Sequence, residues 1–289
     1  MSVPLSPIAF QTLANLLKTK SGLVIGIDKL YLLETRLANI VKRENLPDLN
    51  ALAERLRRLG SDALARDVVE AMTTNESFFF RDDKPFTHFR TRALPTLIAA
   101  RPAGSTLRVW SAASSSGQEA YSLAMIVAES AGILGGRKVE IVGTDIARDQ
   151  LARAREGVYS QFEVQRGLPV QMLMRYFRKD DAAWRIADSI RAMAQFREFN
   201  LLNDLRGLGR FDIVFCRNVL IYFDQPTKTR VLEAIAGLMP PDRMLYLGGA
   251  ETVLGLTPRF APMTQERGVY ALVGAPTKAA MPSRLVAAG

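Results

Sequence analysis

The segment from Thr106 to Asp145 constrains the fold of this chain more than any other. A short apolar run, Leu107–Trp110, gives way to a loop of small residues. An apolar-periodic helix then leads to a second apolar run, Val139–Val142, which is soon followed by an acid. This order predicts a strand–loop–helix–strand unit with a carboxylate at the tip of its second strand, which is typical of an adenosine-bearing cofactor site. Asp145 is placed to accept hydrogen bonds from ribose hydroxyls.

The loop of this unit contains a single glycine, Gly117, and is otherwise built from Ser and Ala. A nicotinamide site would normally carry Gly-x-Gly-x-x-Gly, and a nucleoside triphosphate site would need Gly-x-x-x-x-Gly-Lys-Ser/Thr. Neither motif is present. An acid after the second strand and a polar pair, Arg217-Asn218, after a later one better suit S-adenosylmethionine. Its sulfonium and amino acid moiety need carboxylates and dipoles rather than a pyrophosphate cradle.

The rest of the chain divides into helical and α/β parts. Apolar residues recur at helical spacing through residues 7–72, so an all-α N-terminal domain is expected. Buried strands are predicted at 211–216, 244–247 and 269–273, and residues 184–199 alternate like a small antiparallel insertion. The predicted divisions are residues 1–73 (helical domain), 74–85 (linker and lid), 86–275 (α/β domain with the insertion at about 184–199) and 276–289 (loose tail).

Composition excludes several kinds of site. The chain has 289 residues, with one cysteine and one histidine, which leaves no internal disulfide, no Cys- or His-cluster metal site and no Ser-His-Asp triad without that histidine. No metal is expected. We also expect a cytoplasmic protein without a signal peptide and without membrane insertion. The excess of 38 Lys+Arg over 29 Asp+Glu favours acidic partners.

Three basic residues of the helical domain are seven positions apart: Lys29, Arg36 and Arg43. At this spacing they share one side of a helix, and Lys42 lies beside them. One interpretation is a solvated flank next to a buried stripe. The alternative is a docking surface for an acidic partner.

The segment from Thr73 to Asp82 contains three consecutive phenylalanines between polar residues. This pattern fits neither a helix nor an alternating strand. It could be an aromatic hinge that packs the two domains together. It could also line a cofactor cleft, with Asn75, Ser77 and Arg81 pointing polar groups at the ligand.

Several motifs together resemble the CheR-type chemotaxis receptor methyltransferases over roughly residues 5–275. In chain order they are Thr73-Thr74-Asn75, Phe79-Phe80-Arg81, Arg108-Val109-Trp110-Ser111-Ala112-Ala113, Gly117-Gln118-Glu119, Tyr121-Ser122, Gly143-Thr144-Asp145-Ile146, Phe215-Cys216-Arg217-Asn218-Val219 and Ile221-Tyr222-Phe223-Asp224. The resemblance implies an α/β, Rossmann-like class I methyltransferase domain with a small antiparallel β insertion, preceded by an all-α domain. It also implies methyl transfer from S-adenosylmethionine to glutamates of the cytoplasmic helices of chemoreceptors, with S-adenosylhomocysteine as product.

The same resemblance assigns roles to individual positions. The implied cofactor contacts are Asn75, Ser77, Arg81, Ala113, Glu119, Asp145, Asn200, Leu201, Arg217 and Asn218. Arg81 and Tyr222 are the residues expected beside the reacting centre. The receptor is expected to dock on the basic side of the helical domain, at Lys29, Arg36, Lys42 and Arg43.

The chain departs from the family pattern at several points. Gln118 replaces an acid commonly found beside Glu119, and Gly248-Gly249-Ala250-Glu251 replaces Gly-His-Ser-Glu. The segment Lys179 to Trp184 is short and contains no glycine. Family members that grip a C-terminal receptor pentapeptide tend to carry a longer, glycine-containing loop there. We therefore predict that this protein does not depend on such a tether.

Two other functions stay open on the residues alone. The basic composition would suit a nucleic-acid methyltransferase. However, amino-directed DNA enzymes carry an Asn/Asp-Pro-Pro-Tyr/Phe type motif where this chain has Arg217-Asn218-Val219-Leu220, so no nucleic-acid partner is expected. The other alternative is a regulator that binds S-adenosylmethionine without transferring its methyl group.

Overall fold

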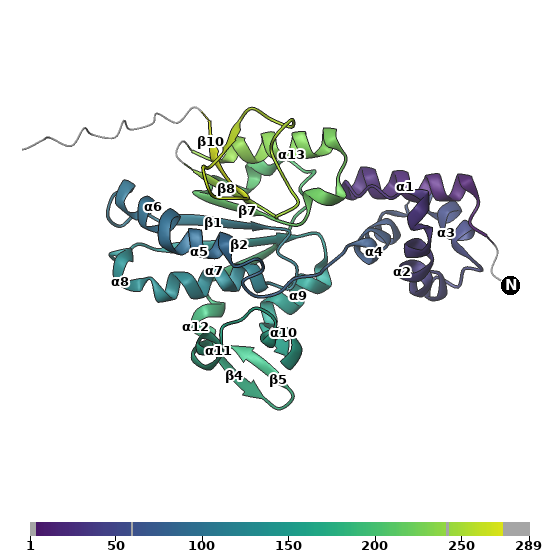
Figure 1. Cartoon of the computed structure of the whole chain (residues 1–289). Coiled ribbons are helices and arrows are strands. Elements are labelled where there is room, and N and C mark those ends of the chain that lie inside the picture. The colour runs from purple at the N-terminus through teal and green to yellow at the C-terminus, as the bar shows by residue number, and fades with distance from the viewer. Residues whose placement is uncertain (1–3, 59, 241–242, 274–289) are drawn as a thin grey trace, which may run out of the picture.

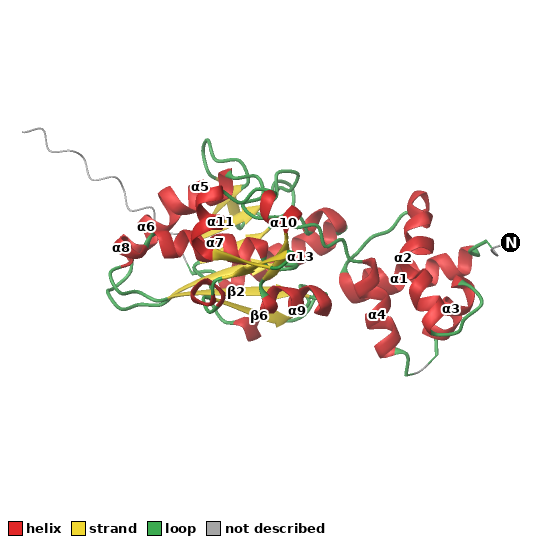
Figure 2. Ribbon diagram, turned by 90° about the horizontal axis from the view of Figure 1, so that it is seen from below, coloured by secondary structure: helices red, strands yellow, loops and turns green. Residues whose placement is uncertain are grey.

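The computed structural model describes residues 4–58, 60–240 and 243–273. A bundle of helices at the N-terminus joins an α/β domain, and the two lie end to end (Figures 1 and 2). The predicted all-α domain followed by a Rossmann-like domain with a small antiparallel sheet is thereby confirmed. The predicted tail at 276–289 lies outside the described residues.

Four α-helices and one short 3₁₀ turn form the N-terminal domain. They are α1 (Pro7–Ser21), η1 (Ile27–Lys29), α2 (Leu30–Arg43), α3 (Leu49–Leu56) and α4 (Asp62–Met72). The side chain of Ser6 caps α1, and Pro7 occupies its first turn. Helix α1 ends at Gly22, whose φ of 82° favours glycine. Fully buried leucines and valines from the four helices form the core of this domain.

The second domain is built on a seven-stranded sheet of order β6-β2-β1-β7-β8-β10-β9. Its strands are β1 (Leu107–Ala112), β2 (Val139–Asp145), β6 (Ala194–Glu198), β7 (Ile213–Cys216), β8 (Met244–Leu247), β9 (Phe260–Pro262) and β10 (Val269–Leu272). The first five in spatial order are parallel, and β10 runs antiparallel to both neighbours. The carboxyl ends of β1, β2 and β7 therefore meet at one edge.

Helices cover both faces of this sheet (Figure 1). They are α5 (Lys84–His88), the π-helical turn η2 (Phe89–Ala93), α6 (Leu94–Ala100), α7 (Gln118–Glu129), α8 (Ala131–Leu134), α9 (Arg148–Glu156), α12 (Asp188–Arg191), η3 (Leu205–Leu208), η4 (Leu220–Tyr222) and α13 (Gln225–Leu238). One apolar cluster packs α5, α6 and α7 on the sheet, and a second packs α13 and η3 on the opposite face. The sheet is therefore buried between two layers of side chains.

The small sheet does not lie where the sequence pattern placed it. It consists of β3 (Val158–Ser160), β5 (Ala183–Ile186) and β4 (Phe177–Asp180), with α10 (Gln161–Gln165) and α11 (Val170–Tyr176) between β3 and β4. We call residues 158–186 the β insertion. The predicted range of about 184–199 is wrong for residues 194–198, which form edge strand β6 of the large sheet, parallel to β2. Alternation identifies a half-exposed strand but not the sheet that it joins.

Contacts between the domains flank the edge where the strands end. The N–H of Val24 donates to the carbonyl of Tyr222 at 3.0 Å, and Lys18 pairs with Asp224 at 2.9 Å. A Cβ at Gly22 would lie 2.9 Å from the Phe223 ring, so only glycine fits at this approach. Within the described part of the chain, no helix is long and apolar enough to cross a bilayer.

Asp224 caps helix α13 and pairs with Lys18 across the domain junction, so it offers a test of these two contacts together. Hydrogen bonds from Thr227 and Lys18 lower the pKa of its carboxyl from 3.8 to about 2. Because the pKa is lower in the folded state, the charge stabilises the fold above about pH 4, and this contribution declines as the pH falls toward 2. Asp224→Asn should reduce the free energy of unfolding at pH 7 by about 1 kcal/mol. Urea titrations at pH 7 and pH 3 should show a smaller loss at the lower pH.

The matched control is Asp204→Asn, because the pKa of Asp204 is also about 2 and it also caps a helical turn, but its partner, Arg206, lies two residues away in that turn, η3. This substitution should leave the domain junction unchanged. An Asp224→Asn penalty that is equal at both pH values would contradict the assignment.

Candidate functional site

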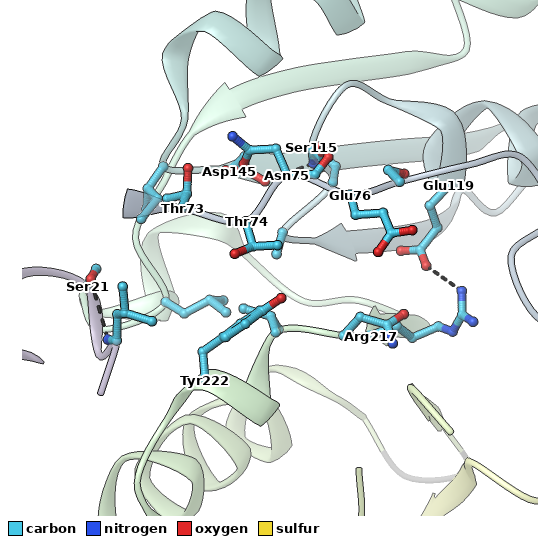
Figure 3. Close-up of a pocket in the computed structure, with 18 of the residues that line it drawn as sticks. Ser21, Thr73, Thr74, Asn75, Glu76, Ser115, Glu119, Asp145, Arg217 and Tyr222 are labelled. Atoms are coloured by element: carbon cyan, nitrogen blue, oxygen red, sulfur yellow. Dashed lines mark hydrogen bonds and ion pairs between the residues drawn. The ribbon is translucent and has the colours of Figure 1, made fainter. Parts of the chain in front are cut away.

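A pocket lies between the two domains, at the carboxyl ends of β1, β2 and β7 (Figure 3). It encloses about 1000 Å³ of empty space, its open mouth included. Every residue predicted to contact the cofactor or the reacting centre lines it: Asn75, Ser77, Arg81, Ala113, Glu119, Asp145, Asn200, Leu201, Arg217, Asn218 and Tyr222. Segments far apart in the sequence are thus brought together at the sheet edge where open α/β folds bind ligands.

The loop after β1 takes an unusual backbone path. Ala113 and Ser115 have φ values of 58° and 49°, and Gly117 has a φ of 92°. The N–H of Ser115 donates to Oδ2 of Asp145 at 2.8 Å, which ties this loop to the tip of β2. Small side chains at these positions keep the backbone close to the pocket.

Asp145 is the last residue of β2, and 8% of its surface is exposed. Its second oxygen accepts the N–H of Ala147 at 2.9 Å. Burial raises the pKa of Asp145, and the backbone N–H donors oppose that shift. Each carboxylate oxygen has a further lone pair. A carboxylate in this position can accept ribose hydroxyls.

Arg217 is the most buried charge of the pocket, with 1% of its side chain exposed. Its guanidinium donates to Oε2 of Glu119 at 2.9 Å, to Oδ2 of Asp82 at 2.8 Å and to the carbonyl of Arg81 at 2.8 Å. Figure 3 shows the first of these bonds at one end of the pocket. The hydroxyl of Ser111 donates to the other oxygen of Glu119 at 2.8 Å. Both charged side chains are therefore held rigidly.

The lining suits an adenosine cofactor that carries a charged amino acid group. Leu23, Met72, Phe199 and Leu201 supply an apolar wall, while Glu119 and Asp145 supply carboxylates. Ser114 also lines the pocket, is 1% exposed, and its hydroxyl finds no hydrogen-bond partner among the described residues. A buried hydroxyl without a partner is costly unless a ligand satisfies it. The residues present fit S-adenosylmethionine.

The segment from Asn75 to Arg81, which we call the lid, covers one side of the pocket. Its Asn75 carbonyl accepts the hydroxyl of Ser115 at 2.9 Å. Phe79 is fully buried, with its ring edge-on to Tyr159 at 5.0 Å, whereas Phe78 lines the pocket. The cleft interpretation therefore holds for Phe78, whereas the ring contacts of Phe79 lie within the α/β domain, so the interpretation of the run as a hinge that packs the two domains together is wrong for Phe79. Phe79 packs the lid on the β insertion, and Phe78 faces the pocket.

Asn200 and Tyr222 lie where the helical domain reaches the pocket. The side-chain amide of Asn200 donates to the carbonyl of Lys20 at 2.5 Å, and its oxygen accepts the N–H of Leu202 at 2.9 Å. The hydroxyl of Tyr222 points into the pocket in Figure 3. Ser21 and Leu23 also line the pocket, and nothing in the sequence pattern indicated them.

Glu251 is a further residue whose role the sequence did not reveal. Its carboxylate, 8% exposed, accepts the N–H groups of Asn218 (2.8 Å), Val219 (3.0 Å), Ile221 (3.3 Å) and Gly248 (2.6 Å). Asn218 has a φ of 59°, so these bonds offset a conformation that costs a non-glycine residue free energy. Glu251 thus fixes the loop that carries the pocket residues Arg217 to Tyr222.

Of the departures from the family pattern, Ser77, where a Thr is expected, lines the pocket, whereas Gln118 and the Gly248–Glu251 corner lie beside it. Gln118 is buried, and its side-chain oxygen accepts the hydroxyl of Ser116 at 2.9 Å. It is not among the residues that line the pocket. Gly249 and Ala250 replace the His and Ser of the family corner, and Glu251 is retained there.

The proposed docking residues all lie outside the pocket, on the helical domain. Arg36 donates to the carbonyls of Met72 and Thr73 at 2.8 and 2.9 Å, so it braces the chain just before the lid. Arg43 pairs with Asp67 at 2.7 Å. Lys29 and Lys42 are exposed, and neither forms an ion pair within the described ranges.

Comparison with known proteins agrees with this geometry. Residues 8–73 match the model of the CheR methyltransferase all-alpha domain, and residues 75–269 match that of the CheR methyltransferase SAM binding domain. Chemotaxis protein methyltransferase Cher2 of Pseudomonas putida is 37% identical over 90% of this chain and 96% of its own length. Chemotaxis protein methyltransferase 1 of Pseudomonas aeruginosa is 39% identical over the same shares. Chemotaxis protein methyltransferase 1 of Vibrio cholerae is 35% identical over 93% of this chain and 98% of its own length.

The two family models together span most of the chain, and the pocket lies where the matched domains meet. The chain belongs to the CheR family of chemotaxis protein methyltransferases, with an all-α domain followed by an S-adenosylmethionine-binding domain.

Proposed function

We propose that this protein transfers the methyl group of S-adenosylmethionine to glutamate side chains on the cytoplasmic helices of chemoreceptors, and that it releases S-adenosylhomocysteine. The observation that carries the proposal is the convergence of the lid, the loops after β1, β2 and β7, and the helical domain on one pocket. The proposed substrate lies on the cytoplasmic side of the membrane. We therefore propose that this protein acts in the cytoplasm.

The chemistry explains why the site has no catalytic His or Cys. S-adenosylmethionine supplies an electrophilic methyl group on a sulfonium. A glutamate carboxylate, ionised at neutral pH, can attack that carbon directly; an O–C bond forms while the C–S bond breaks, and its electron pair stays on sulfur. No proton is transferred. Because both charges disappear, a site that excludes water and aligns the reactants helps more than a strong base.

Arg81 and Tyr222 are the residues that we propose align the reactants. The guanidinium of Arg81 lines the pocket and forms no ion pair with the described residues, so it is available to a carboxylate. That carboxylate belongs either to the substrate glutamate or to the amino acid moiety of the cofactor. The hydroxyl and ring of Tyr222 lie on the opposite side of the pocket from Glu76 in Figure 3 and can border the path of the methyl group.

A transfer assay tests the function. The protein is incubated with S-adenosylmethionine carrying a tritiated methyl group, together with a receptor cytoplasmic fragment, with DNA or RNA, or with no acceptor. We expect base-labile methyl ester on the receptor fragment. Label on nucleic acid would support the nucleic-acid methyltransferase alternative. Label on nothing would support the regulator that binds S-adenosylmethionine without transferring the methyl group. Either result would overturn the proposal.

The role of Asp145 can be tested by binding alone. Asp145→Asn should weaken S-adenosylhomocysteine binding by about 10- to 100-fold, because a charge-assisted acceptor for the ribose hydroxyls is lost. Asp149→Asn is the matched control, since Asp149 is an exposed acid of the following helix that does not line the pocket. Isothermal titration calorimetry gives both affinities, and unchanged binding by Asp145→Asn would contradict the assignment.

The docking surface can be tested with Lys29 and Lys42, which form no ion pair with the residues that the structure describes. The double substitution Lys29→Glu and Lys42→Glu should raise the KM for the receptor fragment several-fold, since the resemblance implies acidic methylation helices, and should leave cofactor affinity unchanged. The increase should shrink at high salt. Arg36→Glu is a contrasting variant. It should also weaken cofactor binding, because Arg36 braces the chain before the lid. A KM for the lysine variant that equals the wild-type value would exclude this surface.

The β4–β5 hairpin bears on the proposed independence from a receptor pentapeptide. Its turn is short and takes a φ of 49° at Asp181, without the glycines of tethered family members. Calorimetric titration of the C-terminal receptor pentapeptide should therefore give no measurable heat of binding. Micromolar affinity would overturn this part of the proposal.

A further inference from the structure

The β insertion contacts the lid through Arg166, which lies between α10 and α11. Nη2 of Arg166 donates to Oε1 of Glu76 at 2.5 Å, and the Arg166 guanidinium lies 4.2 Å from the centroid of the Phe78 ring. The next residue, Gly167, has a φ of 83°, and a Cβ there would lie 2.1 Å from the carbonyl oxygen of Phe79. The backbone of the insertion therefore packs directly on the backbone of the lid.

Arg81 is held by the same short segment. Its Nη1 donates to the main-chain carbonyl of Glu76 at 3.0 Å, and its guanidinium lies 5.4 Å from the centroid of the Phe78 ring. Glu76 thus contacts one arginine through its side chain and the other through its backbone. Of the two guanidinium groups, only that of Arg166 pairs with the Glu76 carboxylate.

The Glu76 carboxylate is a potential competitor for Arg81. It lines the pocket, and Figure 3 shows it pointing inward from the lid. The hydrogen bond from Arg166 is the main cause that lowers the pKa of Glu76, so the group is ionised at neutral pH, and Arg81 adds a weaker contribution of the same sign. Arg166 and Arg81 are the cations whose charges act on this carboxylate, so loss of Arg166 leaves it to Arg81, because a guanidinium pairs readily with an adjacent carboxylate.

We propose that Arg166 is a positioning residue supplied by the β insertion. By holding the carboxylate of Glu76, it keeps the guanidinium of Arg81 available for a carboxylate that enters the pocket. The entering group is the carboxylate of the substrate glutamate or that of the cofactor. This inference rests on the proposed function, and it assigns the insertion a part in the reaction that needs no receptor tether.

The experiment compares Arg166→Ala, Arg166→Lys, Glu76→Gln and the double variant Arg166→Ala/Glu76→Gln. Arg166→Ala should lower kcat/KM for the receptor fragment by up to about fivefold, because the Arg166 and Glu76 side chains are 41% and 53% exposed and ion pairs in such positions are worth at most about 1 kcal/mol. Arg166→Lys should retain most of the activity. The double variant should match Glu76→Gln, because the competing charge is gone. The control Arg153→Ala removes another ion pair to the insertion, between Arg153 of α9 and Glu163 of the insertion at 2.8 Å, and should match the wild-type protein.

Binding separates the two possible carboxylates. If Arg81 serves the cofactor, Arg166→Ala should weaken S-adenosylhomocysteine in calorimetry. If Arg81 serves the substrate, that affinity should stay unchanged while the receptor KM rises. Wild-type kinetics for Arg166→Ala, or a double variant as slow as Arg166→Ala, would overturn the proposal, because a purely structural role cannot be rescued by removing a charge.

Failure of the proposed function would be seen separately, as absence of receptor methylation by the wild-type protein. In that case a crystal structure of Arg166→Ala still decides the matter. A salt bridge between Arg81 and the Glu76 carboxylate supports the inference, and two side chains that remain apart refute it.

Discussion

The buried charge of Arg217 constrains the whole pocket. A guanidinium that is 1% exposed must be paired, because an isolated charge in that position would cost several kcal/mol. Its partners come from different parts of the chain: Glu119 from the first turn of α7, the carbonyl of Arg81 from the end of the lid, and Asp82 from the residue that follows the lid. The end of β7 therefore sets the position of all three. The requirement to pair this charge defines the end of the pocket where the cofactor's charged group is proposed to lie.

Acids around the pocket have two distinct tasks. Asp145 and Glu251 both accept backbone N–H groups, and in doing so they support loops whose conformations are unfavourable for residues other than glycine. Glu119 and Glu76 instead pair with arginines. Asp145 accepts backbone N–H groups and also lines the pocket. Glu251 accepts backbone N–H groups of the loop after β7 but does not line the pocket. A carboxylate near a binding site is thus not by itself evidence of contact with the ligand.

Much of this arrangement could be predicted from the sequence. The strand–loop–helix–strand unit around Asp145 carries its own periodicity and turn signals, and the motifs at Arg81, Arg217 and Tyr222 follow the order of a known family. Contacts between segments that are distant in the chain have no comparable signal in the sequence. The pairing of β6 with β2, the four bonds to Glu251 and the contribution of Ser21 depend on which chain segments meet in space. The spacing of Arg36 with Lys29 and Arg43 likewise suggested an open basic surface. The guanidinium of Arg36 instead donates hydrogen bonds to main-chain carbonyls just before the lid.

The two-domain lining of the pocket has a thermodynamic consequence. Ser21, Leu23 and Met72 belong to the helical domain or its immediate connection, while Asp145 and Arg217 belong to the α/β domain. A ligand that touches both sets gains affinity only while the domains are docked, and by reciprocity its binding must strengthen that docking by an equal free energy. Binding of the cofactor should therefore tighten the contact between the two domains, and release of the spent cofactor should loosen it by the same free energy.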